Sequence, residues 1–280
     1  MRWTLHAELI KRLPTWLYKI LAQLWIDRKF PRHIFVETTT SCQLSCANCP
    51  RPRVSHHLPY SLFKKIVDEA SSFGKRSFSL HLFGEPLLYP RILEGIEYIK
   101  SRGHAVILTT NGLLLGRVYK QLRGVDKIIW SYKADVKVPE ELKTWKNFTV
   151  RFFEKREDSS WKRYEIKKWH NYGGQSSTAH STVGPRYPCY HPFLAPGVTA
   201  KGEIVICCAD PKQKSSVGNI KDMSLVEAWK KMEWIRQQHL SGVYRGICER
   251  CDVWKVYPNI WFSWQYGTCV SSGNGTKTRS

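Results

Sequence analysis

Residues 38–50 read TTTSCQLSCANCP and place Cys42, Cys46 and Cys49 close together on the chain. They directly follow residues 33–36, His-Ile-Phe-Val, whose composition predicts a buried strand. In open α/β folds ligands collect at the carboxyl ends of strands. Three thiolates can hold three irons of a cubane cluster and leave the fourth iron open, as catalysis requires. A structural zinc site would recruit a fourth ligand, such as His56 or His57, and this alternative stays open.

Downstream, segments of strand composition alternate with segments of helical periodicity. We expect strands at residues 33–36, 77–82, 104–109, 126–132, 148–153 and 164–170, and helices at 62–70, 92–101, 113–122 and 139–145. Such alternation predicts a parallel sheet with right-handed crossovers. Between 153 and 164 there is room for only a short helix. The expected fold class is therefore α/β, a partial (β/α)6 barrel shortened near its end.

The spacing Cys-x3-Cys-x2-Cys after a first strand resembles the signature of the radical S-adenosylmethionine (SAM) superfamily. The resemblance implies that Cys42, Cys46 and Cys49 ligate a catalytic 4Fe-4S cluster, whose free iron binds the amino and carboxylate groups of SAM. It further implies that one electron splits SAM into methionine and a 5′-deoxyadenosyl radical, which abstracts a substrate hydrogen atom. The superfamily usually has an aromatic residue before the third cysteine, near the adenine, where this chain has Asn48.

Three further segments resemble SAM-binding elements of that superfamily. Gly84-Glu85-Pro86 follows the second expected strand, where glycine permits close backbone approach and a carboxylate or carbonyl can pair with the SAM ammonium. Thr110-Asn111 follows the third, and Ser131 ends the fourth, where a hydroxyl often reaches the ribose. The alternatives are an ordinary turn for each of the first two segments and a structural serine for the third. Glu165 and His170 could face the substrate, although a surface or core position is the simpler expectation.

A second set of cysteines lies in the last third of the chain. A hairpin expected over residues 198–207, a helix opened by the capping box of Ser224 and Glu227, and the pair Cys248 and Cys251 follow one another there. This order is similar to the short SPASM/twitch extension of radical SAM enzymes. The resemblance implies one auxiliary 4Fe-4S cluster, with the ligands Cys189, Cys207, Cys248 and Cys251.

Some cysteine assignments stay open. Cys207 is preferred over Cys208 as the third ligand because it ends the expected strand, which leaves Cys208 spare or a proton or hydrogen-atom donor. A structural zinc ribbon would suit the same four thiolates. Cys269 lies outside every motif, and a buried or idle thiol is expected there.

The motifs divide the chain into five parts. We expect an amphipathic helical segment at 1–32, the barrel at 33–170, a Gly/Ser/Thr-rich linker at 171–188, the cluster-binding β-hairpin/helix module at 189–262 and a tail at 263–280. In the first part the apolar side chains recurring at helical spacing are Leu17, Ile20, Leu21, Leu24 and Trp25. We expect them to pack against the main domain, with a membrane-surface or nucleic-acid contact as the alternative.

Composition limits the class of protein and of partner. The 280 residues are 42% hydrophobic and 13% aromatic, enough for a packed core. No stretch reaches the roughly 18 consecutive apolar residues of a membrane span, and early charges break up any signal-peptide core. We therefore expect a cytoplasmic protein, in which clustered thiols favour metal over disulfides. The net charge of +21 favours polyanions or anionic substrates.

These observations leave three functions open. The first is a radical SAM enzyme that modifies an anionic substrate, either nucleic acid or a phosphorylated metabolite, with electrons from flavodoxin or ferredoxin. The second is a ribosomal-peptide maturase, although the 32 residues before the barrel are too few for the winged-helix peptide-binding domain of such enzymes. The third is a zinc protein that binds nucleic acid without catalysis.

Overall fold

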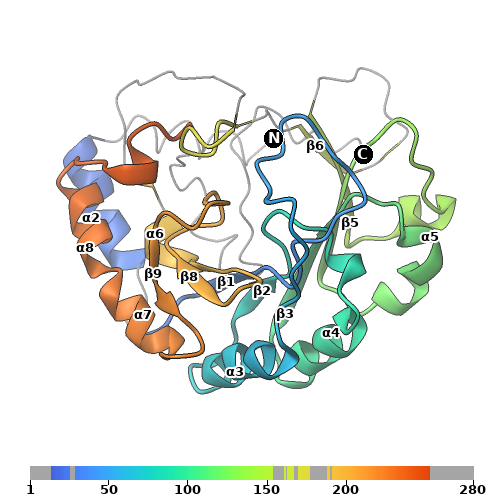
Figure 1. Ribbon diagram of the computed structural model, residues 1–280, viewed down its shortest axis with the longest axis horizontal. Helices are drawn as coiled ribbons and strands as arrows, with labels where there is room; N and C mark the ends of the chain where they lie inside the picture. Colours follow the sequence, from blue (N-terminus) through green and yellow to red (C-terminus); the bar gives the residue numbers. More distant parts are fainter. Residues whose placement is uncertain are drawn as a thin grey trace.

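The structure is a computed structural model that describes residues 14–25, 29–153, 161, 163–166, 170–176, 188–189 and 191–252. Its centre is a nine-stranded sheet in the order β6-β5-β4-β3-β2-β1-β7-β8-β9. The strands are β1 (His33–Val36), β2 (Ser77–Ser79), β3 (Ala105–Thr110), β4 (Lys127–Ser131), β5 (Phe148–Phe152), β6 (Tyr164–Ile166), β7 (Gly197–Val198), β8 (Glu203–Val205) and β9 (Ser216–Asn219). Figure 1 shows the sheet as an open trough rather than a closed barrel.

The first six strands are parallel, each paired with the next along the chain. Their buried faces are rich in Ile, Val, Leu and Phe, as expected for strands covered on both sides. The predicted α/β partial barrel of six parallel strands is confirmed. The second strand ends earlier than predicted, at Ser79, because the chain there turns toward residues 84–86.

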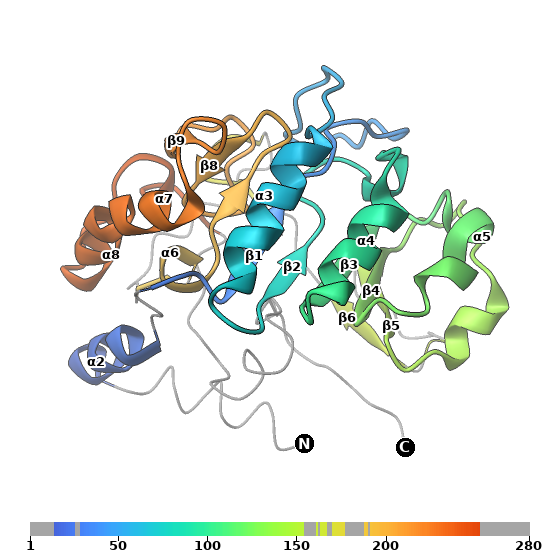
Figure 2. The same cartoon turned by 90° about the horizontal axis from the view of Figure 1, so that it is seen from below.

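The crossovers become shorter along the chain. Two full helices, α3 (Tyr60–Ser71) and α4 (Ile92–Ser101), follow β1 and β2. After β3 come the short helix α5 (Leu115–Val118) and the 3-10 turn η2 (Tyr119–Leu122), and after β4 only the 3-10 turn η3 (Glu140–Thr144). These elements cover the outer face of the trough in Figures 1 and 2, and their apolar stripes close the core against the sheet.

The C-terminal hairpin continues the same sheet, which the sequence did not predict. Strand β7 pairs in parallel with β1, and β8 and β9 follow as antiparallel strands. The predicted turn at Lys201-Gly202 is present, with a φ of +88° at Gly202. The short helix α6 (His191–Leu194) precedes the hairpin.

The expected capping box is present, since Ser224 and Glu227 bond each other's backbone at the start of α7 (Leu225–Lys231). The predicted single helix is divided at Met232 into α7 and α8 (Glu233–Leu240). The apolar side chains at helical spacing are buried, namely Leu225, Ala228, Trp229, Met232 and Ile235. The last short element is η4 (Gly246–Cys248).

The N-terminal helix α2 (Thr15–Trp25) contradicts one expectation. Ile20 and Leu24, predicted to pack against the main domain, are 49% and 71% exposed. The residue that anchors the helix is Tyr18, which is fully buried. Burial at Tyr18 turns the opposite side of the helix outward, because residues two apart lie on different helix faces. Among the described residues no helix has the length and apolarity needed to cross a membrane.

Candidate active site

One cavity of about 240 Å³ occupies the concave side of the sheet. Side chains near the carboxyl ends of β1 to β5 line it, which is where parallel α/β sheets bind ligands. Of the predicted site residues, the cavity brings together Cys42, Cys46, Cys49, Gly84, Glu85, Thr110, Asn111 and Ser131. Pro86 does not line the cavity; it is buried and opens the 3-10 turn η1 (Pro86–Leu88).

The loop that carries the first three cysteines is held from inside by Arg51. This side chain is only 8% exposed, and its guanidinium donates to the carbonyls of Thr40 (3.1 Å), Leu44 (3.1 Å) and Cys42 (3.5 Å). Guanidinium donors pair well with several oxygens at once because they are planar and always charged. No sequence pattern marks Arg51, which lies two positions after Cys49.

The cysteines of this loop are partly exposed toward the cavity. A backbone bond from Cys49 to Cys46 (3.1 Å) closes the turn between the last two. Desolvation raises the pKa of the Cys49 thiol, against the lowering effect of the backbone and charge of Arg51. Thiolates bind iron, so metal loading here would release protons.

Gly84 lies where the second strand's loop crosses the cysteine loop. A Cβ atom at this position would stand 1.8 Å from the carbonyl oxygen of Thr39, so only glycine fits. The adjacent amide of Glu85 donates to the carbonyl of Ser41 at 2.7 Å. The glycine thus permits a close backbone approach to the cysteine loop, and its approach to SAM stays a prediction.

The Glu85 carboxylate binds the third-strand segment. It accepts from the Thr110 hydroxyl (2.8 Å) and from the backbone amides of Asn111 (2.7 Å) and Leu87 (3.2 Å). Burial raises the pKa of Glu85 to about 7, with these hydrogen bonds opposing the shift. The hydrogen bonds from Thr110 and Asn111 hold Glu85 against the segment that carries these two residues.

Asn111 reaches the cysteine loop from the third strand. Its amide nitrogen lies 3.7 Å from the Cys42 sulfur and 3.2 Å from the Gln43 side-chain oxygen. Next to it, the Thr109 hydroxyl is buried, lines the cavity and has no hydrogen-bond partner in the described part of the chain. A buried polar atom of this kind calls for a polar ligand. The lining thus suits a ligand with amino, carboxylate and hydroxyl groups, such as SAM.

The second cysteine set lines a separate and smaller cavity. Cys189, Cys207, Cys248 and Cys251 all border it, and the structure therefore brings together the four predicted thiols. Cys207 is buried, and desolvation raises the pKa of its thiol well above the ordinary value. Cys208 points the other way and lines the first cavity. Cys269 lies outside the described residues.

Within the described ranges, no three His, Cys, Asp or Glu side chains converge closely enough to hold a single metal ion. Zinc draws four ligands to about 2.3 Å for sulfur, whereas the corners of a cubane cluster are wider apart. The thiols of both sets are the donors that iron–sulfur clusters use.

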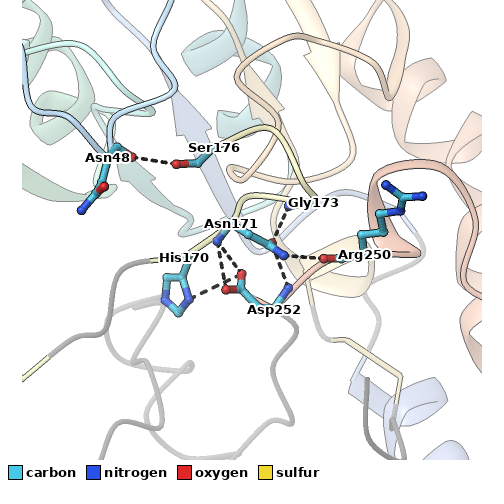
Figure 3. Close-up of polar contacts among 7 residues, drawn as sticks. All are labelled: Asn48, His170, Asn171, Gly173, Ser176, Arg250 and Asp252. Atoms are coloured by element: carbon cyan, nitrogen blue, oxygen red, sulfur yellow. Dashed lines mark hydrogen bonds and ion pairs between the residues drawn. The ribbon is translucent and has the colours of Figure 1, made fainter. Parts of the chain in front are cut away.

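Residues 170–176 join the two cysteine regions, as Figure 3 shows. The Asn171 side chain donates to the carbonyl of Arg250 (2.7 Å) and accepts from the amides of Gly173 and Asp252. At the other end, the Ser176 hydroxyl donates to the carbonyl of Asn48 at 3.2 Å, inside the first cysteine loop. The residues at the start of the expected linker therefore connect the first cysteine loop to the segment around Cys248 and Cys251 through hydrogen bonds.

Three residues between the two cavities were not among the predicted site residues. Tyr172, with a φ of +49°, lines the first cavity, and Gly173 lines the second. His191 borders both. Their roles depend on contacts between distant parts of the chain, so no local pattern marks them.

The first cavity is also basic. Lys133 and Arg151 line it from the ends of β4 and β5, together with His81, His170 and His191, and its only carboxylate among the described residues is Glu85. Sequence reasoning favoured a surface or core place for His170 and did not select Lys133 or Arg151. Their position just beyond or at strand ends is the signal that could have found them.

Comparison with known proteins agrees with this geometry. Residues 189–252 match the SPASM family model, described as an iron–sulfur cluster-binding domain. The fold matches the crystal structure of BtrN in complex with AdoMet and 2-DOIA with a TM-score of 0.64 and 21% identity, over 82% of this chain and 98% of that one. Together these matches support a radical SAM enzyme with a SPASM domain at residues 189–252.

The chain is also similar to two curated proteins. It is 24% identical over 241 residues to the S-adenosyl-L-methionine-dependent 2-deoxy-scyllo-inosamine dehydrogenase of Niallia circulans, covering 78% of this chain and 92% of that protein. It is 32% identical over 107 residues to the tungsten-containing aldehyde ferredoxin oxidoreductase cofactor-modifying protein of Pyrococcus furiosus, covering 36% of this chain. The chain spans only 30% of the length of that second relative.

A peptide-modifying protein shares the fold as well. The structure of Streptococcus suis SuiB bound to precursor peptide SuiA matches with a TM-score of 0.60 and 14% identity, over 80% of this chain and 70% of that one. At such identities the likeness concerns the fold alone. The partial barrel predicted from the sequence is thus confirmed, whereas the substrate is not settled by resemblance.

Proposed function

We propose that this radical SAM protein reductively cleaves SAM and abstracts a hydrogen atom from an anionic substrate in the first cavity. Cys42, Cys46 and Cys49 would hold the catalytic 4Fe-4S cluster. Bound together there, the cluster and SAM would supply a 5′-deoxyadenosyl radical. The observation that carries the proposal is that the three thiols share one cavity with the glycine-bearing loop and the Thr110-Asn111 segment.

The chain's own residues would place SAM in that cavity. Gly84 lets the loop of residues 84–86 lie against the cysteine loop, and Glu85 fixes the segment that presents Asn111. The Thr109 hydroxyl offers an unused polar contact, and Ser131 adds a second hydroxyl at the end of β4. These residues, which follow the cysteines along the chain, would bind and orient SAM, while the open side of the cavity would admit substrate.

The auxiliary 4Fe-4S cluster would be held by Cys189, Cys207, Cys248 and Cys251. Four protein ligands leave no open position, which suits electron acceptance or a structural role. Cys208 would be left facing the substrate cavity. The geometry thus supports Cys207 over Cys208 as the ligand.

An anionic substrate is supported by the charge of the cavity. Lys133 and Arg151 line it, and Glu85, its single carboxylate in the described part, is engaged in hydrogen bonds. Guanidinium and ammonium groups bind carboxylate and phosphate through charge-assisted hydrogen bonds. A phosphorylated metabolite or a nucleotide end would therefore be favoured over a neutral peptide backbone.

An electron carrier such as flavodoxin or ferredoxin would approach from outside the cysteine loop. A second, open groove there is lined by Ser41, Cys42, Ser45, Arg51, Arg53 and Ser55. Cys42 borders both this groove and the substrate cavity. Basic side chains beside a ligand of the catalytic cluster complement the acidic surface of such carriers.

The test is anaerobic reconstitution followed by reduction with SAM. Two cubane clusters predict a brown protein with about eight irons per chain, which produces 5′-deoxyadenosine. A colourless protein that binds zinc, lacks iron and produces no 5′-deoxyadenosine would refute the proposal and favour the zinc-binding alternative.

Substrate class is tested separately, by binding of DNA, RNA, phosphorylated metabolites and peptides at increasing salt. A polyanion predicts affinity that falls steeply with ionic strength. Salt-independent binding of a peptide would instead support the maturase alternative.

A further inference from the structure

The helix α2 presents an unusual apolar face to solvent. Trp16, Ile20 and Leu24 are 64%, 49% and 71% exposed. They recur every four residues, so they lie on one helix face, over an arc of about 80° at 3.6 residues per turn. Large side chains in such a continuous row are uncommon on a free surface and mark an interaction site.

The opposite face of α2 attaches it to the protein. Tyr18 points roughly 160° away from the middle of this row. Its side chain is fully buried and its hydroxyl donates to the carbonyl of Pro188 at 3.2 Å. The helix contacts α6 and lies at the edge of the molecule in Figure 2. The outward direction of the apolar row is therefore fixed by the anchor.

The sequence around α2 is strongly basic. Residues 1–32 contain the seven basic residues Arg2, Lys11, Arg12, Lys19, Arg28, Lys29 and Arg32, against the two acidic residues Glu8 and Asp27. Within α2 itself Lys19 is the single charged residue. An exposed Trp/Leu face combined with flanking Lys and Arg is typical of helices that lie in the interface of anionic membranes.

We infer that the Trp16/Ile20/Leu24 face of α2 docks this protein on an anionic lipid surface. The helix has 11 residues and so is about 16 Å long, shorter than the roughly 30 Å of a bilayer core, and it would lie in the membrane plane. Charge complementarity between a chain of net charge +21 and anionic headgroups selects this occupant over a second, equally basic copy of the chain.

Docking there would also orient the two cysteine sites. Tyr18 binds the carbonyl of Pro188, the residue before Cys189, and α6 begins with His191, which borders both cavities. The anchor of α2 is thus only a few residues from the auxiliary thiols. The inference does not depend on the proposed chemistry, because lipid binding can be measured without clusters or SAM.

The test is co-sedimentation of the full chain with vesicles of phosphatidylglycerol and phosphatidylcholine, compared with phosphatidylcholine alone. Binding to the anionic vesicles is expected, and 0.5 M salt should weaken it. The triple variant Trp16→Ser/Ile20→Ser/Leu24→Ser should lower the partition coefficient by about tenfold or more, since it removes the buried apolar area. Unchanged far-UV circular dichroism and melting temperature would show that the variant folds.

The matched control is Trp234→Ser, which removes a tryptophan of α8 whose side chain is 50% exposed. It should leave vesicle binding within twofold of the unsubstituted protein. The inference is overturned if the unsubstituted protein ignores anionic vesicles, if the triple variant binds as well as before, or if Trp234→Ser weakens binding equally. Concentration-dependent self-association that only the triple variant loses, without vesicle binding, would identify a second copy as the occupant instead.

Discussion

The two cysteine regions differ in how the chain brings their thiols together. Cys42, Cys46 and Cys49 come from one loop, are partly exposed and share a wide cavity with polar side chains. Cys189, Cys207, Cys248 and Cys251 come from three distant segments and enclose a small apolar space. The first arrangement leaves room for a ligand beside three thiols. The second brings four thiols together and leaves no room for a further ligand. The difference separates a reactive site from a closed one.

The largest expected effect comes from removing one cysteine from each set. Cys46→Ala should abolish 5′-deoxyadenosine formation, while Cys248→Ala should retain SAM cleavage and lose substrate conversion. Each should lower the iron content from about eight to about four per chain, because one cubane is lost. Iron analysis and chromatography of the nucleoside products check this. Equal loss of SAM cleavage in both variants would contradict a division of roles.

The next effect concerns the contact between the cysteine loop and the SAM loop. Gly84→Ala should destabilise the apo-protein by about 3 kcal/mol and weaken SAM binding, since its Cβ would stand 1.8 Å from the Thr39 carbonyl. Chemical denaturation and SAM titration measure both. The matched control is Gly116→Ala in α5. An added Cβ there would have no neighbouring side chain or packed segment within 4 Å, so the change should be neutral or stabilising. Gly84→Ala behaving like this control would disprove the close approach.

A smaller effect distinguishes how the two loops are supported. Arg51→Gln should loosen the first loop by about 2 kcal/mol, because charged hydrogen bonds to three carbonyls are lost. It should lower iron in the catalytic site and spare the auxiliary site. Arg53→Gln, an exposed neighbour, is the control. Equal cluster loading in both variants would show that Arg51 does not organise the loop.

Stability should also depend on pH through Glu37, a buried carboxyl that accepts from the amides of Phe83 (3.3 Å) and Ala200 (3.2 Å). Burial raises its pKa to about 7, so the folded state keeps a proton that the unfolded chain loses above about pH 4.5. Stability therefore falls as pH rises from 4.5 to 7, by roughly 1.4 kcal/mol per unit for this group.

Glu85 adds a shift of the same sign, since its pKa is also raised to about 7. Denaturant unfolding across this pH range should show a flatter slope in Glu37→Gln. The exposed Glu140→Gln should leave the slope of the unsubstituted protein unchanged. An unchanged slope in Glu37→Gln would mean that this carboxyl is ionised in the folded protein.

Much of this architecture could be predicted from local patterns. The alternation of strands and helices gave the partial barrel, and the spacing of Cys42, Cys46 and Cys49 gave the place of the first site. The capping box of Ser224 and Glu227 was also readable, because it depends on residues three apart.

What could not be predicted depends on long-range packing. The pairing of β7 with β1 merges the two expected modules into one sheet, and it brings Ala200 to Glu37. Ile20 and Leu24 of α2 are exposed rather than packed as predicted, because the helix is attached through Tyr18, whose buried hydroxyl donates to the carbonyl of Pro188. The expected domain boundaries and the ligand assignments stay predictions.

The central claim is that only the first cysteine set leaves a position for SAM. Electron paramagnetic resonance of the reduced protein tests it most directly, using Cys248→Ala, which keeps the first cluster, and Cys46→Ala, which keeps the auxiliary one. Adding SAM should change the spectrum of Cys248→Ala and leave that of Cys46→Ala unaltered. A SAM-dependent change in Cys46→Ala, or none in Cys248→Ala, would contradict the account.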